Sequence, residues 1–454
     1  MAALLFALLV CSLGDTVVSL RTAEAKEGRT AGLNPLLSRR ASRPSVPELL
    51  ENGTLRVKLQ RRPARNIRGG QLRGAHLPRQ SFMQLGAEAK AKTVFSQPSE
   101  IFGTILVGSP PMEYMVTFDT ASGNLMLPSS KCTGVACLSH QPYDEALSAT
   151  SKPIFMLDDP AENGQREQVK LHVGRGLVTG ELIRDQVCLT KQLSVCAKTA
   201  FISAVEMSDE PFLLFPYDGI LGLGMPALSI QKRFNLMGNL ADVGSLKRNL
   251  FAIWLAETGD EEDSEITFGS LDGDRLGSNV MWLPVSTIAT GLWQVTVKDV
   301  LIGKARLGIC NGKKQCQVAF DSGTNAITGP SAIISQLEAE VNVKEDCTNY
   351  DKLPSLGFDF GEYVLTLEHK DYVMRTSGTS CHHEFFGLDL PPPKGPIFLL
   401  GEPFLKRYYT IYDRTSMRVG IGLAKHKTPS AVKDETIEEA AERLMIPQTH
   451  PDET

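Results

Sequence analysis

Two short segments carry an aspartate in nearly the same local sequence: FDTASGN contains Asp119 and FDSGTNA contains Asp321. In both, the aspartate follows an apolar run typical of a strand, and small and hydroxyl-bearing residues follow it. A single aspartate of this kind is most simply a turn residue, because Asp, Ser, Gly and Asn are the ordinary residues of turns. The second copy favours another interpretation, in which two similar lobes each carry one carboxylate. If the turns face each other, the carboxylates share one site.

Such a shared site has a definite chemistry. Two carboxyl groups within hydrogen-bonding distance do not both ionise readily, so the pair holds one proton over a wide acidic range. The ionised member can accept a proton from a water molecule while the protonated member donates one to a substrate carbonyl. The pair therefore predicts general acid–base catalysis with Asp119 and Asp321 as the catalytic residues.

The elements that position these residues are predicted to be mainly strands. From about Val94, short β-branched and aromatic runs such as IFGTILV and WQVTV alternate with clusters of Gly, Pro and Asp, which favours a mainly β protein. A helix is expected over 331–341, where Pro330 precedes a helical apolar pattern. At 454 residues, with 42% apolar residues, the chain is long enough for two sizeable cores.

Residues 20–92 have a different composition from the rest. They are rich in Arg, Pro and Gly, and they hold 16 Lys and Arg against 5 Asp and Glu, a net charge of +11. Residues 93–454 hold 31 against 46, a net charge of −15. The basic segment by itself buries too little apolar surface to fold. Its acidic partner is expected to be the rest of the same chain.

The first nineteen residues predict a secretory signal peptide. Their apolar run is too short to span a bilayer comfortably, and a small residue suited to cleavage lies near Ser19, although no basic residue precedes the run. The alternative is an N-terminal extension without a targeting role. No later stretch predicts a membrane span. We therefore expect the secretory pathway, with the protein either secreted or held in an acidic, lysosome- or vacuole-like compartment.

Nine cysteines are present, and Cys11 lies in the apolar N-terminal run. The other eight form an even set of neighbours, which in a secreted chain is typical of disulfides. A zinc site would need close pairs with two-residue spacing, and these pairs lack it. We expect four local disulfides and no metal. The neighbouring pairs are Cys132/Cys137, Cys188/Cys196, Cys310/Cys316 and Cys347/Cys381.

From about residue 101 to 424 the chain resembles the pepsin-like aspartic proteases, the group of cathepsin D. The likeness lies in the two aspartate motifs, in IFGTILVGSPP before the first, and in YDGILGLG and FLLGEPFLKRYYTIYDR after each. Three of the cysteine pairs also sit where that family has bridges, and Cys188/Cys196 looks like an addition. The resemblance implies a bilobal fold with a cleft between the lobes, polypeptide substrates, no cofactor and no covalent intermediate.

The same resemblance divides the chain into five parts. It implies a signal peptide over 1–19, a basic propeptide over 20–92, an N-terminal lobe with the first aspartate and the flap over 93–283, a C-terminal lobe with the second aspartate over 284–424, and a polar tail over 425–454. The tail is expected to form at most a short helix. The protein is expected to be a monomeric aspartic endopeptidase, made as an acid-activated zymogen, that binds no nucleic acid.

Four hydroxyl residues are expected to support the aspartates. Thr120 and Ser322 would hydrogen bond the backbone of the opposite turn, whereas Ser122 and Thr324 would hydrogen bond the outer carboxylate oxygens. For each, simple turn capping is the alternative. The residues expected to contact substrate are Ala121, Met126, Val173, Gly174, Arg175, Gly176 and Gly323.

Three departures from the family pattern lie at this site. Ala121 replaces a Gly, Val173 replaces a flap Tyr, and Met126 replaces the Trp to which that Tyr normally hydrogen bonds. Replacing both partners of a buried hydrogen bond by apolar groups can be nearly neutral, which favours a coherent apolar rebuild of the flap. The alternative is a catalytically weak or inactive pepsin-fold protein that binds peptides or another enzyme.

The basic segment is expected to act as an intramolecular inhibitor. A strand of charge +11 would cover the acidic cleft near neutral pH, with Lys58, Lys90 or Lys92 approaching the catalytic pair. Acidification would release it for cleavage between Gln80 and Ser99. A basic sorting or linker segment without inhibitory role is the alternative.

Overall fold

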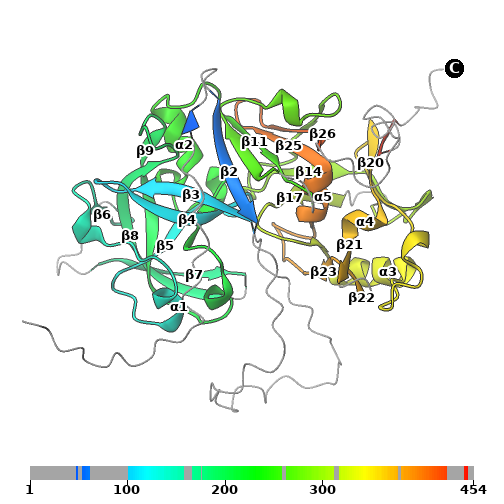
Figure 1. Ribbon diagram of the computed structural model, residues 1–454, viewed down its shortest axis with the longest axis horizontal. Helices are drawn as coiled ribbons and strands as arrows, with labels where there is room; N and C mark the ends of the chain where they lie inside the picture. Colours follow the sequence, from blue (N-terminus) through cyan, green and yellow to red (C-terminus); the bar gives the residue numbers. More distant parts are fainter. Residues whose placement is uncertain are drawn as a thin grey trace, which may run out of the picture. The chain divides into compact units, whose positions relative to one another are not determined.

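The computed structural model describes residues 48–49, 54–61, 101–157, 166–174, 176–257, 262–310, 316–376, 380–426 and 444–447. Strands dominate these residues, and the helices between them are short (Figure 1). This confirms the predicted mainly β class. The signal peptide, most of the basic segment and most of the C-terminal tail lie outside the described residues.

The first aspartate lies in a group of five neighbouring strands. Strand β10 lies between β4, which ends at Asp119, and β5, which follows the aspartate turn. β10 is parallel to β4 and antiparallel to β5, while β5 is parallel to β9 and β3 is antiparallel to β4. In spatial order the strands are β3 (Ile101–Val107), β4 (Met112–Asp119), β10 (Gly219–Gly222), β5 (Leu125–Pro128) and β9 (Cys196–Met207).

The second aspartate lies in a second group with the same order and the same directions. Strand β24 lies between β17, which ends just before Asp321, and β18, which follows the turn. The pairs β17–β24 and β18–β23 are parallel, and β14–β17 and β18–β24 are antiparallel. The two similar lobes predicted from the repeated motif are therefore present. The strands are β14 (Gln294–Val297), β17 (Cys316–Phe320), β24 (Phe398–Leu400), β18 (Ile327–Gly329) and β23 (Phe385–Gly387).

A run of strands continues the first group and brings late segments of the chain beside early ones (Figure 1). Its order from the first group outwards is β2, β12, β11, β25, β26 and β13. The expected lobe boundary at 283/284 falls inside β13. The bounds are β2 (Leu55–Arg61), β12 (Ser264–Phe268), β11 (Leu250–Trp254), β25 (Tyr408–Asp413), β26 (Arg418–Leu423) and β13 (Met281–Pro284).

Strand β2 belongs to the basic segment 20–92. It pairs antiparallel with both β12 and β3, so both of its edges are hydrogen bonded. Leu55, Val57 and Leu59 alternate with polar residues and are buried in the main core, as the period of two in a strand requires. This part of the basic segment is therefore folded because it pairs with strands of the rest of the chain and packs into their core.

The remaining elements cover the two lobes. The strands are β1 (Glu48–Leu49), β6 (Lys152–Pro153), β7 (Gln168–Val173), β8 (Gly176–Cys188), β15 (Asp299–Ile302), β16 (Ala305–Arg306), β19 (Leu356–Asp359), β20 (Tyr363–Leu367), β21 (Val373–Thr376), β22 (Ser380–His383) and β27 (Met445–Pro447). The helices are α1 (Val135–Leu138), α2 (Leu236–Asp242), α3 (Ser331–Val341), α4 (His369–Tyr372) and α5 (Glu402–Arg407). Short 3-10 turns lie at Glu145–Leu147, Phe212–Leu214, Pro226–Leu228, Lys232–Phe234, Gly273–Arg275 and Tyr350–Lys352. Helix α3 confirms the helix predicted over 331–341.

The C-terminal segment 425–454 is not wholly a polar tail. Strand β27 pairs antiparallel with β20, and Leu444 and Met445 are buried in the main core. The helix expected just before it falls largely outside the described residues. The pairing of β27 with β20 therefore ties the described part of this segment to the C-terminal lobe.

Four disulfides connect the neighbouring cysteines, and this confirms the predicted bridges. They are Cys132–Cys137, Cys188–Cys196, Cys310–Cys316 and Cys347–Cys381. In the described parts of the chain, no helix is long and apolar enough to cross a bilayer. The same parts contain no cluster of three or more His, Cys, Asp or Glu residues suited to a metal ion.

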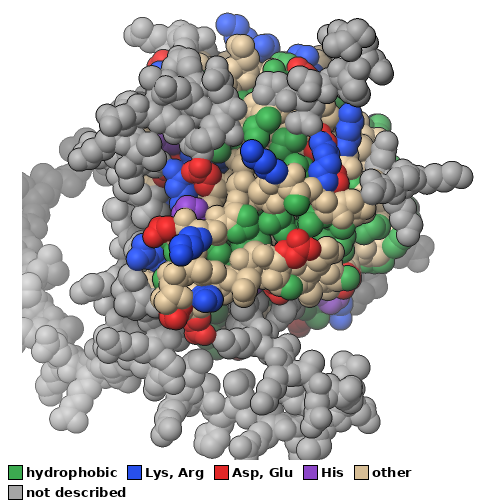
Figure 2. All heavy atoms as spheres, turned by 90° about the vertical axis from the view of Figure 1, so that its right-hand side faces the viewer, with side chains coloured by type: hydrophobic (Ala, Val, Ile, Leu, Met, Phe, Trp, Pro, Cys, Tyr) green, Lys and Arg blue, Asp and Glu red, His purple; other side chains and the backbone are tan. Residues whose placement is uncertain are grey.

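The face of the C-terminal lobe shown in Figure 2 carries apolar side chains interleaved with acidic and basic ones. Such mixing is ordinary, because a folded protein has too little polar surface to cover itself completely. We therefore place no site on this face.

Candidate active site

The two aspartate turns meet. The backbone N–H of Thr120 donates to the Ser322 hydroxyl at 3.1 Å, and the Ser322 N–H donates to the Thr120 hydroxyl at 3.0 Å. Gly323 lies against both carboxylates, since a Cβ atom there would be 2.7 Å from Asp119 Oδ1 and 3.1 Å from Asp321 Oδ1. Asp119 and Asp321 therefore share one site.

Two hydroxyl groups hold the turns together. Thr120 Oγ1 donates to the Phe320 carbonyl oxygen at 2.7 Å, and Ser322 Oγ donates to the Phe118 carbonyl oxygen at 2.6 Å. Each residue thus bonds the backbone just before the opposite aspartate, as the sequence predicts for them. Because Thr120 and Ser322 are buried, these bonds fix the two turns away from water.

The backbone holds each carboxylate in the same way. Ala121 N–H donates to Asp119 Oδ1 at 2.8 Å, and Gly323 N–H donates to Asp321 Oδ1 at 2.8 Å. These two bonds are equivalent under the internal repeat, so both carboxylates are presented by the same turn geometry. Neither donor was expected, because the prediction considered only side-chain hydroxyls.

The two outer hydroxyls differ from the expectation. Thr324 Oγ1 accepts from the Ala326 N–H at 3.4 Å and makes no hydrogen bond to Asp321. The Ser122 hydroxyl is buried and has no hydrogen bond of normal geometry, although it lies close enough to Asp119 to lower the pKa of that carboxyl. The predicted symmetric pair of outer hydrogen bonds is therefore wrong for Thr324.

Burial raises the pKa of both carboxyl groups. For Asp119 the Ala121 N–H and the Ser122 hydroxyl oppose this increase. For Asp321 the charge of Asp119 adds to it. One proton is therefore shared by the pair, with Asp321 the member that is harder to ionise.

The flap is a β-hairpin formed by β7 and β8. Val173 and Gly176 are paired across its tip, Gly174 has a φ of 57°, and Arg175 lies outside the described residues. A Cβ atom on Gly176 would lie 2.5 Å from the Phe212 ring, so only glycine fits there. The hairpin therefore packs closely against Phe212 where β8 begins, at Gly176.

Val173 and Met126 belong to one apolar cluster, which we call the flap cluster. Val173, on the flap, is half-buried against this cluster, while Met126, on β5, is buried inside it. The two departures from the family pattern therefore share one apolar environment. The buried members are Phe102, Met126, Cys132, Ala136, Cys137, Val178, Ile202, Ala204, Met207, Phe212, Tyr217 and Ile220.

Ala121 is accommodated without strain. Its φ is not among the positive values, which non-glycine residues adopt here only at Leu193, Asn342, Cys347 and Met417 of the described chain. Its side chain packs against an apolar cluster that contains Ala319. The alanine in place of the family's Gly therefore requires no left-handed backbone at this turn.

Comparison with known proteins agrees with this geometry. The family model described as "Eukaryotic aspartyl protease" matches residues 100–424. The chain belongs to the eukaryotic aspartyl protease family. A cathepsin E from Aquarana catesbeiana is 30% identical over 387 residues, which cover 81% of this chain and 93% of that protein. A pepsin A from Sus scrofa is 29% identical over 333 residues, covering 71% and 81%.

A renin from Rattus norvegicus is 30% identical over 340 residues, covering 72% of this chain and 80% of that protein. These likenesses confirm the family and the enzyme class, aspartic endopeptidase, that the two motifs predicted. Within the family match lie both aspartates and the flap, whereas strand β2 lies before it.

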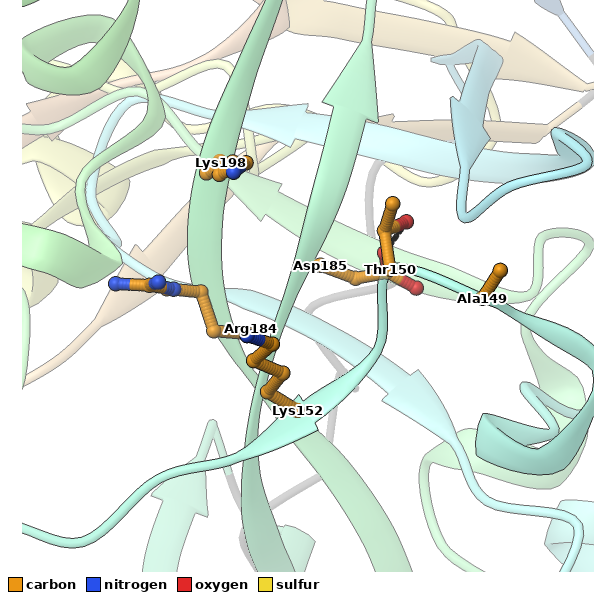
Figure 3. A pocket seen from close by; sticks show the side chains of 6 residues that line it. All are labelled: Ala149, Thr150, Lys152, Arg184, Asp185 and Lys198. Carbon is orange, nitrogen blue, oxygen red and sulfur yellow. Dashed lines mark hydrogen bonds between the residues drawn. The ribbon is translucent and has the colours of Figure 1, made fainter. Parts of the chain in front are cut away.

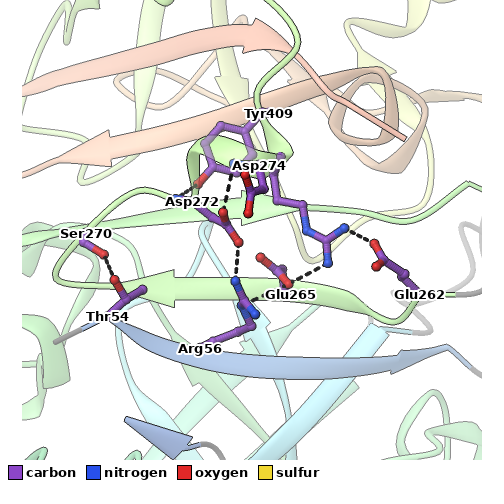
Figure 4. Close-up of polar contacts among 9 residues, drawn as sticks. Thr54, Arg56, Glu262, Glu265, Ser270, Asp272, Asp274 and Tyr409 are labelled. Atoms are coloured by element: carbon purple, nitrogen blue, oxygen red, sulfur yellow. Dashed lines mark hydrogen bonds and ion pairs between the residues drawn. The ribbon is translucent and has the colours of Figure 1, made fainter. Parts of the chain in front are cut away.

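Strand β2 forms ion pairs with residues inside the family match. The sequence pattern did not predict these pairs. Arg56 Nε lies 3.3 Å from Glu265, and Arg56 also pairs with Asp272 (Figure 4). Arg61 pairs with Glu402 on α5. The apolar–polar alternation in LRVKLQR is a local signal for a strand. The acidic partners of Arg56 and Arg61 are more than 200 positions away along the chain, so no local signal identifies them.

Lys58 does not approach the catalytic pair. It is exposed on β2 and lies opposite Glu265 of β12 in the sheet. The suggestion that Lys58 meets the aspartates is therefore wrong, because the alternation that buries Leu55, Val57 and Leu59 turns it outward. Lys90 and Lys92 lie outside the described residues.

A separate hollow lies on the N-terminal lobe. This cavity of about 240 Å³ is lined by Ala149, Thr150, Lys152, Arg184, Asp185 and Lys198 (Figure 3). Asp185 accepts hydrogen bonds from Tyr143 at 2.7 Å and from Thr150. None of the residues predicted for the active site lines it.

Proposed function

We propose that this protein hydrolyses peptide bonds with a water molecule activated by Asp119 and Asp321. The observation that carries the proposal is the reciprocal set of hydrogen bonds by which Thr120 and Ser322 hold the two carboxylates at one site. The ionised carboxylate accepts a proton from water, and the protonated carboxyl donates one to the substrate carbonyl. The proton taken from water replaces the one given to the carbonyl, so the pair again holds one proton, and because water itself attacks the carbonyl carbon no covalent intermediate is needed.

The direction of the pKa shifts supports a division of roles. Burial and the charge of Asp119 raise the pKa of Asp321, so Asp321 is the member that holds the proton before water attacks and donates it to the substrate carbonyl. Asp119, whose carboxylate is stabilised by the Ala121 N–H and the Ser122 hydroxyl, is the ionised member and accepts the proton from water. The apparent pKa values nevertheless belong to the pair.

The substrates we propose are polypeptides with bulky apolar side chains on both sides of the cut bond. Met126 and Val173 are apolar and share the flap cluster, so a substrate strand that lies along the hairpin meets apolar surface. A cleavage profile with charged residues at both positions would contradict this.

We further propose that residues 20–92 are a propeptide that inhibits the enzyme until it reaches an acidic compartment of the secretory route. The support is the net charge of +11 against −15 and the ion pairs of Arg56 and Arg61 with buried carboxylates. The structure changes the expected inhibitory contact: the segment contributes a core strand, and Lys58 is not its contact with the aspartates. The enzyme is proposed to act as a monomer.

The test is hydrolysis of an unfolded protein at graded acidic pH, with and without an inhibitor that mimics the tetrahedral transition state. Inhibitor-sensitive cleavage that rises on acidification supports the proposal. The competing function is a peptide-binding protein without activity, favoured by Ala121, Met126 and Val173. Tight binding of unfolded substrate with no cleavage at any pH would establish that alternative.

A further inference from the structure

Three basic side chains line the hollow on the N-terminal lobe (Figure 3). Lys152 of β6 lies opposite Arg184 of β8. Lys198 of β9 lies opposite Gln186, two residues further along β8. Residues that are opposite each other, or two positions apart, on neighbouring strands share one face of a sheet. Three positive charges are therefore placed together on one face.

These three cations have no acidic partner among the residues that the structure describes. Lys152, Arg184 and Lys198 are all exposed, and none of them forms an ion pair there. Lys131 of the same lobe, by contrast, lies 2.9 Å from Glu145. Like charges that face each other across a sheet repel, so an anion between the three side chains would remove an unfavourable interaction.

The hollow lies at a break in the pairing of β8. On the edge of β8 opposite β9, β6 pairs with residues 183–184 and β3 pairs with residues 187–188. No strand pairs with this edge at Asp185, because β6 is only two residues long. The break opens a space beside the three cations.

Asp185 is the acidic residue that lines the hollow, and its carboxylate is already hydrogen bonded. It is buried, and it accepts from the Tyr143 hydroxyl at 2.7 Å, from the Gln186 N–H at 2.7 Å and from the Thr150 hydroxyl. These bonds tie the segment around Thr150 to β8 and form one wall. The hollow therefore presents three cations against one carboxylate that has its own donors.

A second hollow adjoins the first at Lys198, which lines both. It has a volume of about 360 Å³, and helix α2 forms part of its wall. Amide groups both donate and accept hydrogen bonds, and carboxylates accept them, so this wall suits a ligand with several hydroxyl groups. Its polar lining residues are Gln186, Lys198, Asn239 and Asp242.

We propose that the two hollows together bind a phosphorylated or sulfated sugar. The tetrahedral oxyanion lies in the first hollow and accepts hydrogen bonds from Arg184, Lys152 and Lys198. A guanidinium group can donate two parallel N–H bonds to such an anion, and the lysines add point charges. The sugar ring extends past Lys198 into the second hollow, where its hydroxyls meet the amide and carboxylate side chains.

The size and lining of the first hollow limit its occupant. Its volume of about 240 Å³ is below the range of roughly 300–1,000 Å³ typical of sites for drug-sized ligands, so it holds one ester group. A phospholipid headgroup carries the same anion, but Ala149 is the only apolar residue that lines this hollow. Binding at a membrane surface usually needs buried apolar side chains as well. A water-soluble sugar ester therefore fits better.

The experiment is isothermal titration of the full-length protein at neutral pH and low ionic strength with glucose 6-phosphate, glucose 6-sulfate and glucose. At least one ester should bind saturably and glucose should not, and added salt should weaken binding because the three charges are exposed. Absence of saturable binding of both esters, or equal binding of glucose, overturns the proposal. Binding to vesicles that contain phosphatidylinositol 4-phosphate, with no binding of either ester, also overturns it.

Variants locate the bound anion. Arg184→Gln and Lys198→Gln should each weaken ester binding by about tenfold or more, because each removes a hydrogen bond to a charged group. Lys191→Gln is the matched control: Lys191 is exposed between β8 and β9 and lines neither hollow, so affinity should be kept. All three variants should keep the melting temperature of the free protein, since surface changes without lost contacts have small effects. Equal weakening in all three would indicate a general effect of net charge and overturn the site.

Asp242→Ala tests the second hollow. It should weaken the binding of glucose 6-phosphate relative to that of inorganic phosphate, because only the sugar ester has hydroxyls that the Asp242 carboxylate can accept. An unchanged ratio of the two affinities would overturn the assignment of the sugar to this hollow. Because these measurements need no turnover, their outcome is independent of the proposed peptide hydrolysis.

Discussion

At the scale of single residues, the catalytic proposal depends on the two carboxyl groups that share a proton. Asp119→Asn or Asp321→Asn should lower peptide hydrolysis by at least about 10²- to 10⁴-fold, because an amide can neither share that proton nor activate water. The measurement is kcat/KM on an unfolded substrate, with circular dichroism to verify the fold. Near-native turnover in either variant would rule out the proposed pair.

Equivalent positions of the two turns differ in the space around them. A Cβ atom on Gly323 would lie 2.7 Å from Asp119 Oδ1, whereas the methyl group of Ala121 packs against an apolar cluster that contains Ala319. Gly323→Ala should therefore destabilise the protein by about 1–3 kcal/mol and abolish activity by displacing a carboxylate.

Ala121→Gly is the matched control for this change. It should cost less than about 1 kcal/mol, chiefly through the added freedom of the unfolded chain, and leave most of the activity. Denaturant unfolding and kcat/KM on both variants check the pair of expectations. Equal losses in the two variants would show that the turns are not asymmetric.

At the scale of elements, the flap and strand β5 are predicted to act as one apolar unit. Val173→Tyr alone should not raise activity, because its hydroxyl would meet Met126 and find no partner. The double variant with Met126→Trp should do better than either single change. The coupling is measured as the non-additive part of a double-mutant cycle in kcat/KM, and strictly additive effects would show that the two positions are independent.

The element scale also explains how strand β2 is retained. Its apolar residues face the core, and its cations Arg56 and Arg61 pair with buried carboxylates of β12 and α5 and with Asp272. The alternation of apolar and polar residues therefore determines which face of β2 is buried, and the ion pairs of Arg56 and Arg61 add specific contacts with β12, Asp272 and α5. Release of β2 from the fold therefore requires loss of both the buried apolar contacts and the ion pairs.

At the scale of the whole molecule, the ion pair at the end of β2 is predicted to make stability depend on acidity. Burial alone would raise the pKa of Glu402, but the charges of Lys406 and Arg61 outweigh it, so the pKa is lowered in the folded state. The resulting stability is present above the ordinary pKa of about 4.5 and is lost as the pH falls through the lowered value. Glu402→Gln should cost about 1–3 kcal/mol at neutral pH and less at acid pH.

Glu265→Gln is the comparison for this prediction. Burial raises the pKa of Glu265 despite the nearby Arg275 and Arg56, so its contribution is present at acid pH and lost as the pH rises. Its destabilising effect should therefore shrink between acid and neutral pH, opposite to that of Glu402→Gln. Melting temperatures of both variants from pH 3 to 7 check the two signs, and parallel curves would contradict them.

Local sequence was sufficient for the features that depend on neighbouring residues. The two aspartate motifs, the alternating strands, the helix at Ser331–Val341 and the three cysteine pairs that are five to eight residues apart each carry their own signal. The repeat of one motif also implied two similar lobes. These predictions hold because turn chemistry, periodicity and short loop closure act over a few residues.

Other features were decided only by contacts between distant segments. The outward position of Lys58 follows from pairing of β2 with β12 and β3, and the space at Ala121 but not at Gly323 follows from what packs against each turn. The burial of Tyr217 likewise depends on side chains from several strands. Local patterns specify which residues alternate or turn, whereas packing and strand pairing across the chain determine what each side chain meets.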